Sequence, residues 1–64
     1  MKVLHEEEYQ KHKIQILLLG KTKKLIIIEK NGWKIYDKRS KDTLWDCIGQ
    51  ALTFIDDKKG HNHV

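Results

Sequence analysis

The side chains of this 64-residue chain that could take part in chemistry are four histidines, one cysteine and a Gly-Lys-Thr triplet. His61 and His63 could chelate a metal weakly. Zinc, however, needs three or four rigidly held ligands, and nothing in the sequence brings His5 or His12 to this pair. The pair also lies beyond the predicted helix, where chain termini usually fray. The sequence therefore predicts a flexible tail at residues 60–64 and no metal site.

Neither the cysteine nor the triplet forms a recognisable catalytic motif. Cys47 stands alone, as in reduced intracellular proteins, and its helical neighbours are apolar, so we interpret it as a small core residue. Gly20-Lys21-Thr22 matches the end of a phosphate-binding loop, but Gln15 stands where that motif needs its first glycine, and a strand follows instead of a helix. So short a chain also has little room for an enclosed pocket. We expect a non-enzymatic protein with no cofactor and no small-molecule substrate.

The positive charge is concentrated in the middle of the chain. Residues 11–41 contain ten basic side chains and two acidic ones, whereas residues 1–10 and 42–64 each carry a net charge of −2. Lysines between aromatic residues can follow a phosphate backbone and stack a base. Lysines at strand ends also protect sheet edges from aggregation, and a single arginine suits base readout poorly. The candidate contacts to an anionic partner are Lys21, Lys23, Lys24, Lys30, Lys34, Tyr36, Lys38, Arg39 and Lys41.

The elements that position these side chains begin with three apolar runs in residues 14–36, IQILLLGKTKKLIIIEKNGWKIY. The first run alternates in the manner of a strand, and the second is apolar on both faces, as in a central strand. Asn31-Gly32 predicts a hairpin with a type I′ turn, which needs positive φ at both residues. We therefore predict a three-stranded antiparallel meander over residues 13–38. Residues 1–12 fit either a short strand or a helical turn.

An amphipathic helix is predicted over residues 42–59. Asp42 or Thr43 can cap its start, and Lys58 with Lys59 suits the negative pole at its end. Gly60 can adopt the left-handed conformation that often follows a helix. The apolar arc spans roughly 180°, whereas packing on one sheet face needs about 100°. The helix should therefore contact something besides its own sheet.

The strands have the same surplus of apolar side chains, because one helix covers only one face of a sheet. We therefore predict an α+β domain of βββα order that forms a homodimer. Alternatively, residues 1–12 fold over the second face. A single domain of this size also benefits from a partner, since folding buries only about 60% of its surface. The candidate dimer or core surface comprises Leu17, Leu19, Ile26, Ile28, Trp45, Leu52 and Phe54.

The expected location is the cytoplasm, because the start MKVLHEEEY lacks the apolar core of a signal peptide. The longest apolar runs are four residues, whereas a membrane span needs about 20. The passage GWKIYDKRSKDTLWDCIGQAL resembles the hairpin-then-helix order of small antitoxin-like domains. Size and composition are similar to those of short accessory proteins of phages and mobile elements, which implies a regulator or inhibitor that contacts a host protein. Direct nucleic-acid binding through the lysine-rich sheet face is the alternative.

Overall fold

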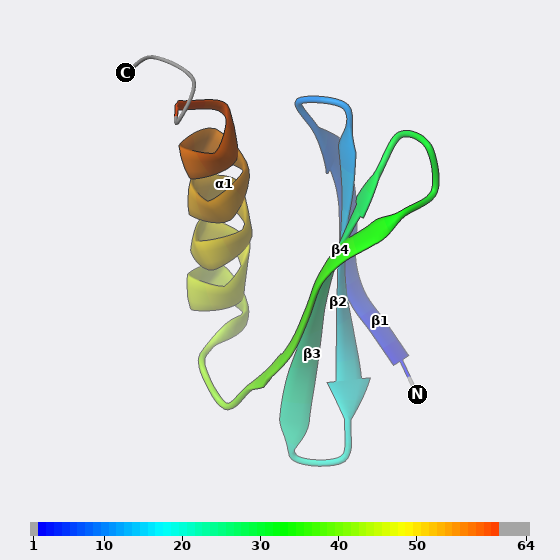
Figure 1. The fold of residues 1–64 in the computed structure, drawn as a ribbon. Helices are drawn as coiled ribbons and strands as arrows, with labels where there is room; N and C mark the ends of the chain where they lie inside the picture. The colour runs from blue at the N-terminus through cyan, green and yellow to red at the C-terminus, as the bar shows by residue number, and fades with distance from the viewer. Residues whose placement is uncertain (1, 61–64) are drawn as a thin grey trace.

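The computed structural model describes the backbone of residues 2–60 and the side chains of residues 2–58. Strands β1 (Lys2–Tyr9), β2 (His12–Leu19), β3 (Thr22–Glu29) and β4 (Lys34–Ser40) form one antiparallel sheet in sequence order, and helix α1 (Leu44–Gly60) follows. Figure 1 shows α1 along one side of the twisted sheet. The α+β class and the C-terminal helix are confirmed. The prediction of three strands was wrong, because residues 2–9 add a fourth.

Strand β1 was difficult to predict because its connection to β2 contains no glycine, asparagine or proline. Gln10 and Lys11 form this two-residue turn with φ of 52° and 64°, the positive values that a type I′ turn requires. Each such non-glycine residue costs roughly 1–2 kcal/mol. Glu8 lies opposite Lys13 across the strand pair, and opposite charges at such positions stabilise a sheet. The run of glutamates is thus a strand held by pairing with β2.

The other two turns use glycine. Gly20, with φ of 62°, opens the β2–β3 turn, and Gly32, with φ of 93°, closes the β3–β4 turn. In the latter, Gly32 N donates to Glu29 O at 2.8 Å, and Glu29 N donates to Trp33 O at 2.8 Å. The prediction of a type I′ turn was wrong, because Asn31 has no positive φ. Its Oδ1 instead accepts a hydrogen bond from Trp33 N at 3.0 Å.

The sheet and α1 share one apolar core. β2 and β3 pair so that Ile14 lies opposite Ile27 and Ile16 opposite Leu25. These four residues face α1, as the predicted alternation requires. Complete burial of a side chain of this size contributes about 1.5–3 kcal/mol. The buried cluster, in which every residue is at most 1% exposed, consists of Ile14, Ile16, Leu25, Ile27, Cys47, Ala51 and Ile55.

Thr43 caps the start of α1. Its Oγ1 accepts from Asp46 N at 3.1 Å, and its carbonyl accepts from Cys47 N at 3.0 Å. This decides between the two predicted caps, because the Asp42 carboxylate accepts from Gln50 Nε2 at 2.7 Å instead. That hydrogen bond is the main reason why the pKa of Asp42 is lowered.

Candidate binding surfaces

Most of the predicted basic contacts lie at one end of the sheet, not on one face. Pairing of β3 with β4 places Lys24 opposite Arg39, with Lys23 and Lys38 in the rows on either side. Lys21 lies in the adjacent β2–β3 turn. The basic end, as we name this region, comprises Lys2, Lys21, Lys23, Lys24, Lys38, Arg39 and Lys41. Two predicted contacts, Lys30 and Lys34, lie at the opposite end.

The two ends of the described structure differ in net charge. The basic end has seven basic side chains and two carboxylates, Asp42 and Asp46, which gives +5. The opposite end has five lysines and five carboxylates, which gives 0. Glu6 and Asp37 share one row in the middle of the sheet and belong to neither end. The lysines of the opposite end are Lys11, Lys13, Lys30, Lys34 and Lys58, and its carboxylates are Glu7, Glu8, Glu29, Asp56 and Asp57. The fold therefore converts a charge difference between chain segments into one between the ends of the molecule.

Only part of the basic end is neutralised within the chain. Lys24 Nζ lies 3.3 Å from Asp37 Oδ1, and Lys23 Nζ donates to the carbonyl of Asp42 at 3.0 Å. Lys38 Nζ lies 5.6 Å from the centre of the Tyr36 ring. Lys2, Lys21, Arg39 and Lys41 make no hydrogen bond or ion pair with any described residue. Four positive charges are thus open to solvent and to an anionic partner.

Tyr36 does not offer a free ring for stacking. It packs edge-on against Phe54 of α1, with ring centres 4.8 Å apart and planes at 62°. The exposed aromatic side chains of the described region are Trp33 and Trp45, at 69% and 79%. Trp45 lies in the first turn of α1. This turn begins beside the basic end, since Lys23 Nζ donates a hydrogen bond to the carbonyl of Asp42 just before the helix. Sequence reasoning had assigned Trp45 to an apolar interface and had missed this position.

The sheet face away from α1 also carries apolar side chains. We call Val3, Leu17, Leu19, Ile26 and Ile28 the open face. Val3 is 54% exposed, whereas Leu17 is only 9% exposed. The seven residues predicted to form one dimer or core surface are therefore divided. Four belong to the open face, and the others, Trp45, Leu52 and Phe54, lie on α1 at the other side of the sheet.

Ion pairs border the open face. Gln15 Nε2 donates to Glu6 Oε2 at 2.5 Å, and Lys13 Nζ lies 3.6 Å from the same oxygen. The hydrogen bond from Gln15, followed by the charge of Lys13, lowers the pKa of Glu6. On the other side, the hydrogen bond from Lys34 to Asp37, at 2.7 Å, is the main cause of the lowered pKa of Asp37. The apolar side chains thus lie in a band between two charged margins.

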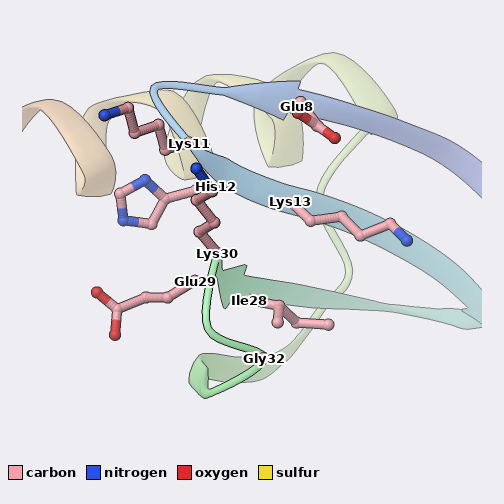
Figure 2. A pocket seen from close by; sticks show the side chains of 8 residues that line it. All are labelled: Glu8, Lys11, His12, Lys13, Ile28, Glu29, Lys30 and Gly32. Atoms are coloured by element: carbon pink, nitrogen blue, oxygen red, sulfur yellow. The ribbon is translucent and has the colours of Figure 1, made fainter.

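A hollow of about 590 Å³ lies between the β1–β2 and β3–β4 turns. Figure 2 shows Lys11 and Lys13 extending in different directions from neighbouring positions of the chain. Glu8 and Glu29 also line the hollow. The positive charges therefore do not converge there, and the hollow offers no concentrated anion site. Its lining residues are Glu8, Lys11, His12, Lys13, Ile28, Glu29, Lys30 and Gly32.

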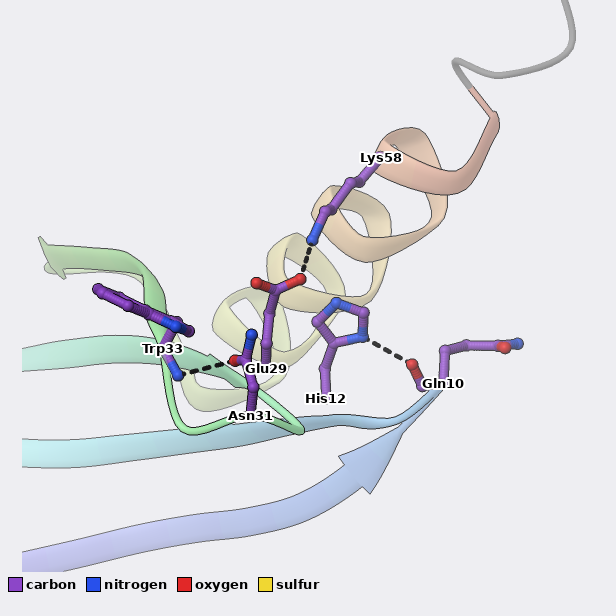
Figure 3. A network of polar contacts seen from close by, with 6 residues as sticks. All are labelled: Gln10, His12, Glu29, Asn31, Trp33 and Lys58. Atoms are coloured by element: carbon purple, nitrogen blue, oxygen red, sulfur yellow. Dashed lines mark hydrogen bonds and ion pairs between the residues drawn. The ribbon is translucent and has the colours of Figure 1, made fainter.

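A polar network beside the hollow connects the turns to the end of α1 (Figure 3). Lys58 Nζ donates to Glu29 Oε2 at 2.5 Å, and this hydrogen bond is the main cause of the lowered pKa of Glu29. His12 is 8% exposed, and its Nδ1–H donates to the Gln10 carbonyl at 2.7 Å. His12 Nε2 is buried with no hydrogen-bond partner among the described residues. The network fixes the turns against α1.

The residue types considered for chemistry are widely separated. Cys47 is completely buried in the core. His5, in the middle of β1, forms a hydrogen bond with Glu7 Oε1 at 2.8 Å. Within residues 2–60, no three His, Cys, Asp or Glu side chains are grouped so that they could hold a metal ion. His61 and His63 lie outside the described residues.

The triplet Gly20-Lys21-Thr22 occupies the β2–β3 turn, and Thr22 Oγ1 donates to Leu19 O at 3.1 Å. A strand follows it, so the residues lack the helix that a phosphate-binding loop opens. The described helix is also too short and too polar to span a membrane. Comparison of the chain with family models, curated proteins and solved structures finds no match.

Proposed function

We propose that this chain is a small non-enzymatic binding protein of the regulator or inhibitor type, and that a second copy of the chain docks on its open face. The observation that carries the proposal is the apolar band of Leu17, Leu19, Ile26 and Ile28, which α1 does not cover. A self-associating protein of this kind acts by presenting its remaining surface to a target.

Charge complementarity supports a second copy as the occupant. Glu8, Lys13, Ile28 and Lys34 form one row across the four strands. A two-fold axis parallel to the strands lays β1 of one copy over β4 of its partner at the same height. Glu8 of each copy then faces the partner's Lys34. In the centre β2 lies over the partner's β3, so Leu17 packs on the aliphatic stem of the partner's Lys24 and Ile26 on that of the partner's Gln15.

The next row is already neutralised within each chain. It contains Glu6 and Asp37, which the same axis brings together. Glu6 is engaged by Lys13, and Asp37 by Lys24 and Lys34. Glu6 of one copy and the partner's Asp37 are therefore each already paired with a lysine where they face each other. The two Glu8–Lys34 contacts set the orientation, and Lys24 keeps Asp37 paired when Lys34 turns to the partner's Glu8.

The size of the face predicts a weak dimer. Three strands of eight residues and one of seven make a face about 19 Å by 26 Å. Burying it on both copies removes about 1,000 Å² from water, the lower limit of a specific interface. We therefore expect dissociation in the micromolar range.

Sedimentation equilibrium of the full chain at 1 to 500 µM, roughly the range for such an interface, tests the dimer. Glu8→Lys and Lys34→Glu should each raise the dissociation constant about tenfold, because each creates like-charge contacts. The double variant Glu8→Lys/Lys34→Glu exchanges the charges between the copies and should recover part of the lost affinity, because the new carboxylate at position 34 also lies beside Asp37. Ile26→Lys should abolish association. A species of 7.6 kDa at every concentration, or a double variant as weak as the single ones, would contradict the proposal.

The regulatory role has its own test. The full chain, immobilised through its C-terminus, is used to retain proteins from a cell lysate, and Ile26→Lys is used in parallel. Recovery of a discrete target whose activity changes on binding supports a regulator or inhibitor. Recovery of the chain itself and nothing else counts against that role, although it leaves the dimer intact.

A further inference from the structure

The positive charges of the basic end repel one another in the folded chain, and this repulsion destabilises the fold. Lys24 and Arg39 lie directly opposite each other on β3 and β4, and like charges at such positions destabilise a sheet. Asp37 offsets part of this repulsion through Lys24, whereas Arg39 has no ion-pair partner among the described residues. Lys23 and Lys38 in the adjoining rows add to the repulsion. A bound polyanion would relieve it.

The shape of the basic end suits a flexible chain of phosphates better than a single small anion. Lys23 and Lys38 belong to the sheet face that packs on α1, and Lys24 and Arg39 to the opposite face. Lys21 stands between them in the turn at the tip. The charges therefore surround the end of the sheet and do not converge on one point, so several phosphates are needed to contact them all.

Trp45 supplies the second property of a nucleic-acid surface. Its side chain is 79% exposed in the first turn of α1, close to the basic end through the Lys23–Asp42 contact. Exposing an indole to water is unfavourable, and an unpaired base can stack on it. Paired bases inside a duplex cannot, because they are already stacked on each other.

We infer that the basic end binds single-stranded nucleic acid, with its lysines and Arg39 on the phosphates and Trp45 stacked on a base. This goes beyond the proposed function and does not require the dimer. Lys24 and Arg39 lie on the face that a second copy would cover, whereas Lys21, Lys23, Lys38 and Lys41 lie outside it. Neutralised phosphates release counterions, so the affinity should fall steeply with salt. Contacts to three to five phosphates predict a slope of about −2 to −4 in a plot of log K against log salt concentration.

The test uses two variants that remove equal charge from opposite ends. Lys21→Glu/Lys41→Glu changes the basic end, and Lys11→Glu/Lys30→Glu changes the opposite end. None of these four side chains pairs with a described residue, and all are exposed or in turns, so both variants should fold, as circular dichroism will verify. Binding is measured by fluorescence anisotropy of a labelled 20-nucleotide single strand, of DNA and of RNA, at several salt concentrations.

The basic-end variant should bind at least tenfold more weakly than the opposite-end variant. In Trp33→Phe, where Trp45 is the remaining tryptophan, the single strand should quench the fluorescence, and Trp45→Ala should weaken binding about five- to hundredfold. Undetectable binding at low salt, or equal loss in the two double variants, would overturn the inference. Equal affinity for duplex DNA, anionic phospholipid vesicles or polyglutamate would overturn it too, since each implies a general response to negative charge.

Discussion

Lys24 and Arg39 face each other across β3 and β4 at the basic end. Two cations in this position oppose strand pairing, and Lys24 alone has an acidic partner there, Asp37, at 3.3 Å. If the basic end binds an anion, a substitution that removes the repulsion between Lys24 and Arg39 should raise the free energy of unfolding and weaken anion binding.

Arg39→Glu should therefore stabilise the fold and weaken nucleic-acid binding. The substitution converts a repulsive cross-strand pair into an attractive one, worth about 0.2–1 kcal/mol. Urea denaturation gives the stability, and anisotropy gives the binding. Arg39→Gln is the control and should give roughly half of each change. A variant that is less stable than the wild type would show that the repulsion between Lys24 and Arg39 is already cancelled.

Lys58→Met should make the fold less sensitive to acid. The pKa of Glu29 is lowered mainly by the hydrogen bond from Lys58. A lowered pKa in the folded state means that the stabilisation is complete above the ordinary value of 4.5 and is lost as the pH falls through the lowered value. Urea midpoints of the variant and the wild type should therefore differ at pH 7 and converge in acid, once the pH has fallen below the lowered pKa of the folded state.

Lys30→Met is the matched control for this experiment, because Lys30 has no ion pair with a described residue. It removes the same charge from the neighbouring turn. Its midpoint should follow the wild type at both pH values. If Lys30→Met behaves like Lys58→Met, the acid response comes from net charge and not from the Glu29–Lys58 contact.

Lys11→Gly should raise stability. Lys11 has φ of 64°, a conformation that glycine adopts without strain and other residues adopt at a cost. The gain is partly offset by the greater freedom of glycine in the unfolded chain, which leaves about 0.5–1 kcal/mol. Lys11→Gln loses the same charge but keeps the strain, so the comparison between the two variants isolates the backbone effect. Equal stability of the two would show that the turn relaxes.

Cys47 should react with an alkylating reagent only when the fold opens. Its side chain is 0% exposed, beside Ile55 in the same core cluster. Ile55→Ala should destabilise the fold by about 2–5 kcal/mol, which corresponds to roughly a 30- to 3,000-fold faster labelling rate if opening is global. Mass spectrometry follows the labelling. A rapid reaction of Cys47 in the native wild type would show that α1 detaches locally.

The sequence by itself determined those elements whose signals are local. Alternating apolar residues predicted β2, and a run that is apolar on both faces predicted β3. The candidate caps Asp42 and Thr43 predicted the start of α1, and the apolar side of that helix was visible in its periodicity. Gly20 and Gly32 marked two turns. Each of these depends on residues close together in the chain, where strand and helix geometry relate spacing directly to position.

The tertiary structure decided what depends on pairing between distant segments. β1 exists because Glu6 and Glu8 pair with Gln15 and Lys13 across a turn that no turn-forming residue marks. Strand register likewise determined which lysines lie opposite each other, since a shift of one residue would move every side chain to the other face. The separation of charge between the ends, and the position of the start of α1 beside Lys23, followed from the antiparallel order of the strands and the contact of Lys23 with Asp42, and not from composition.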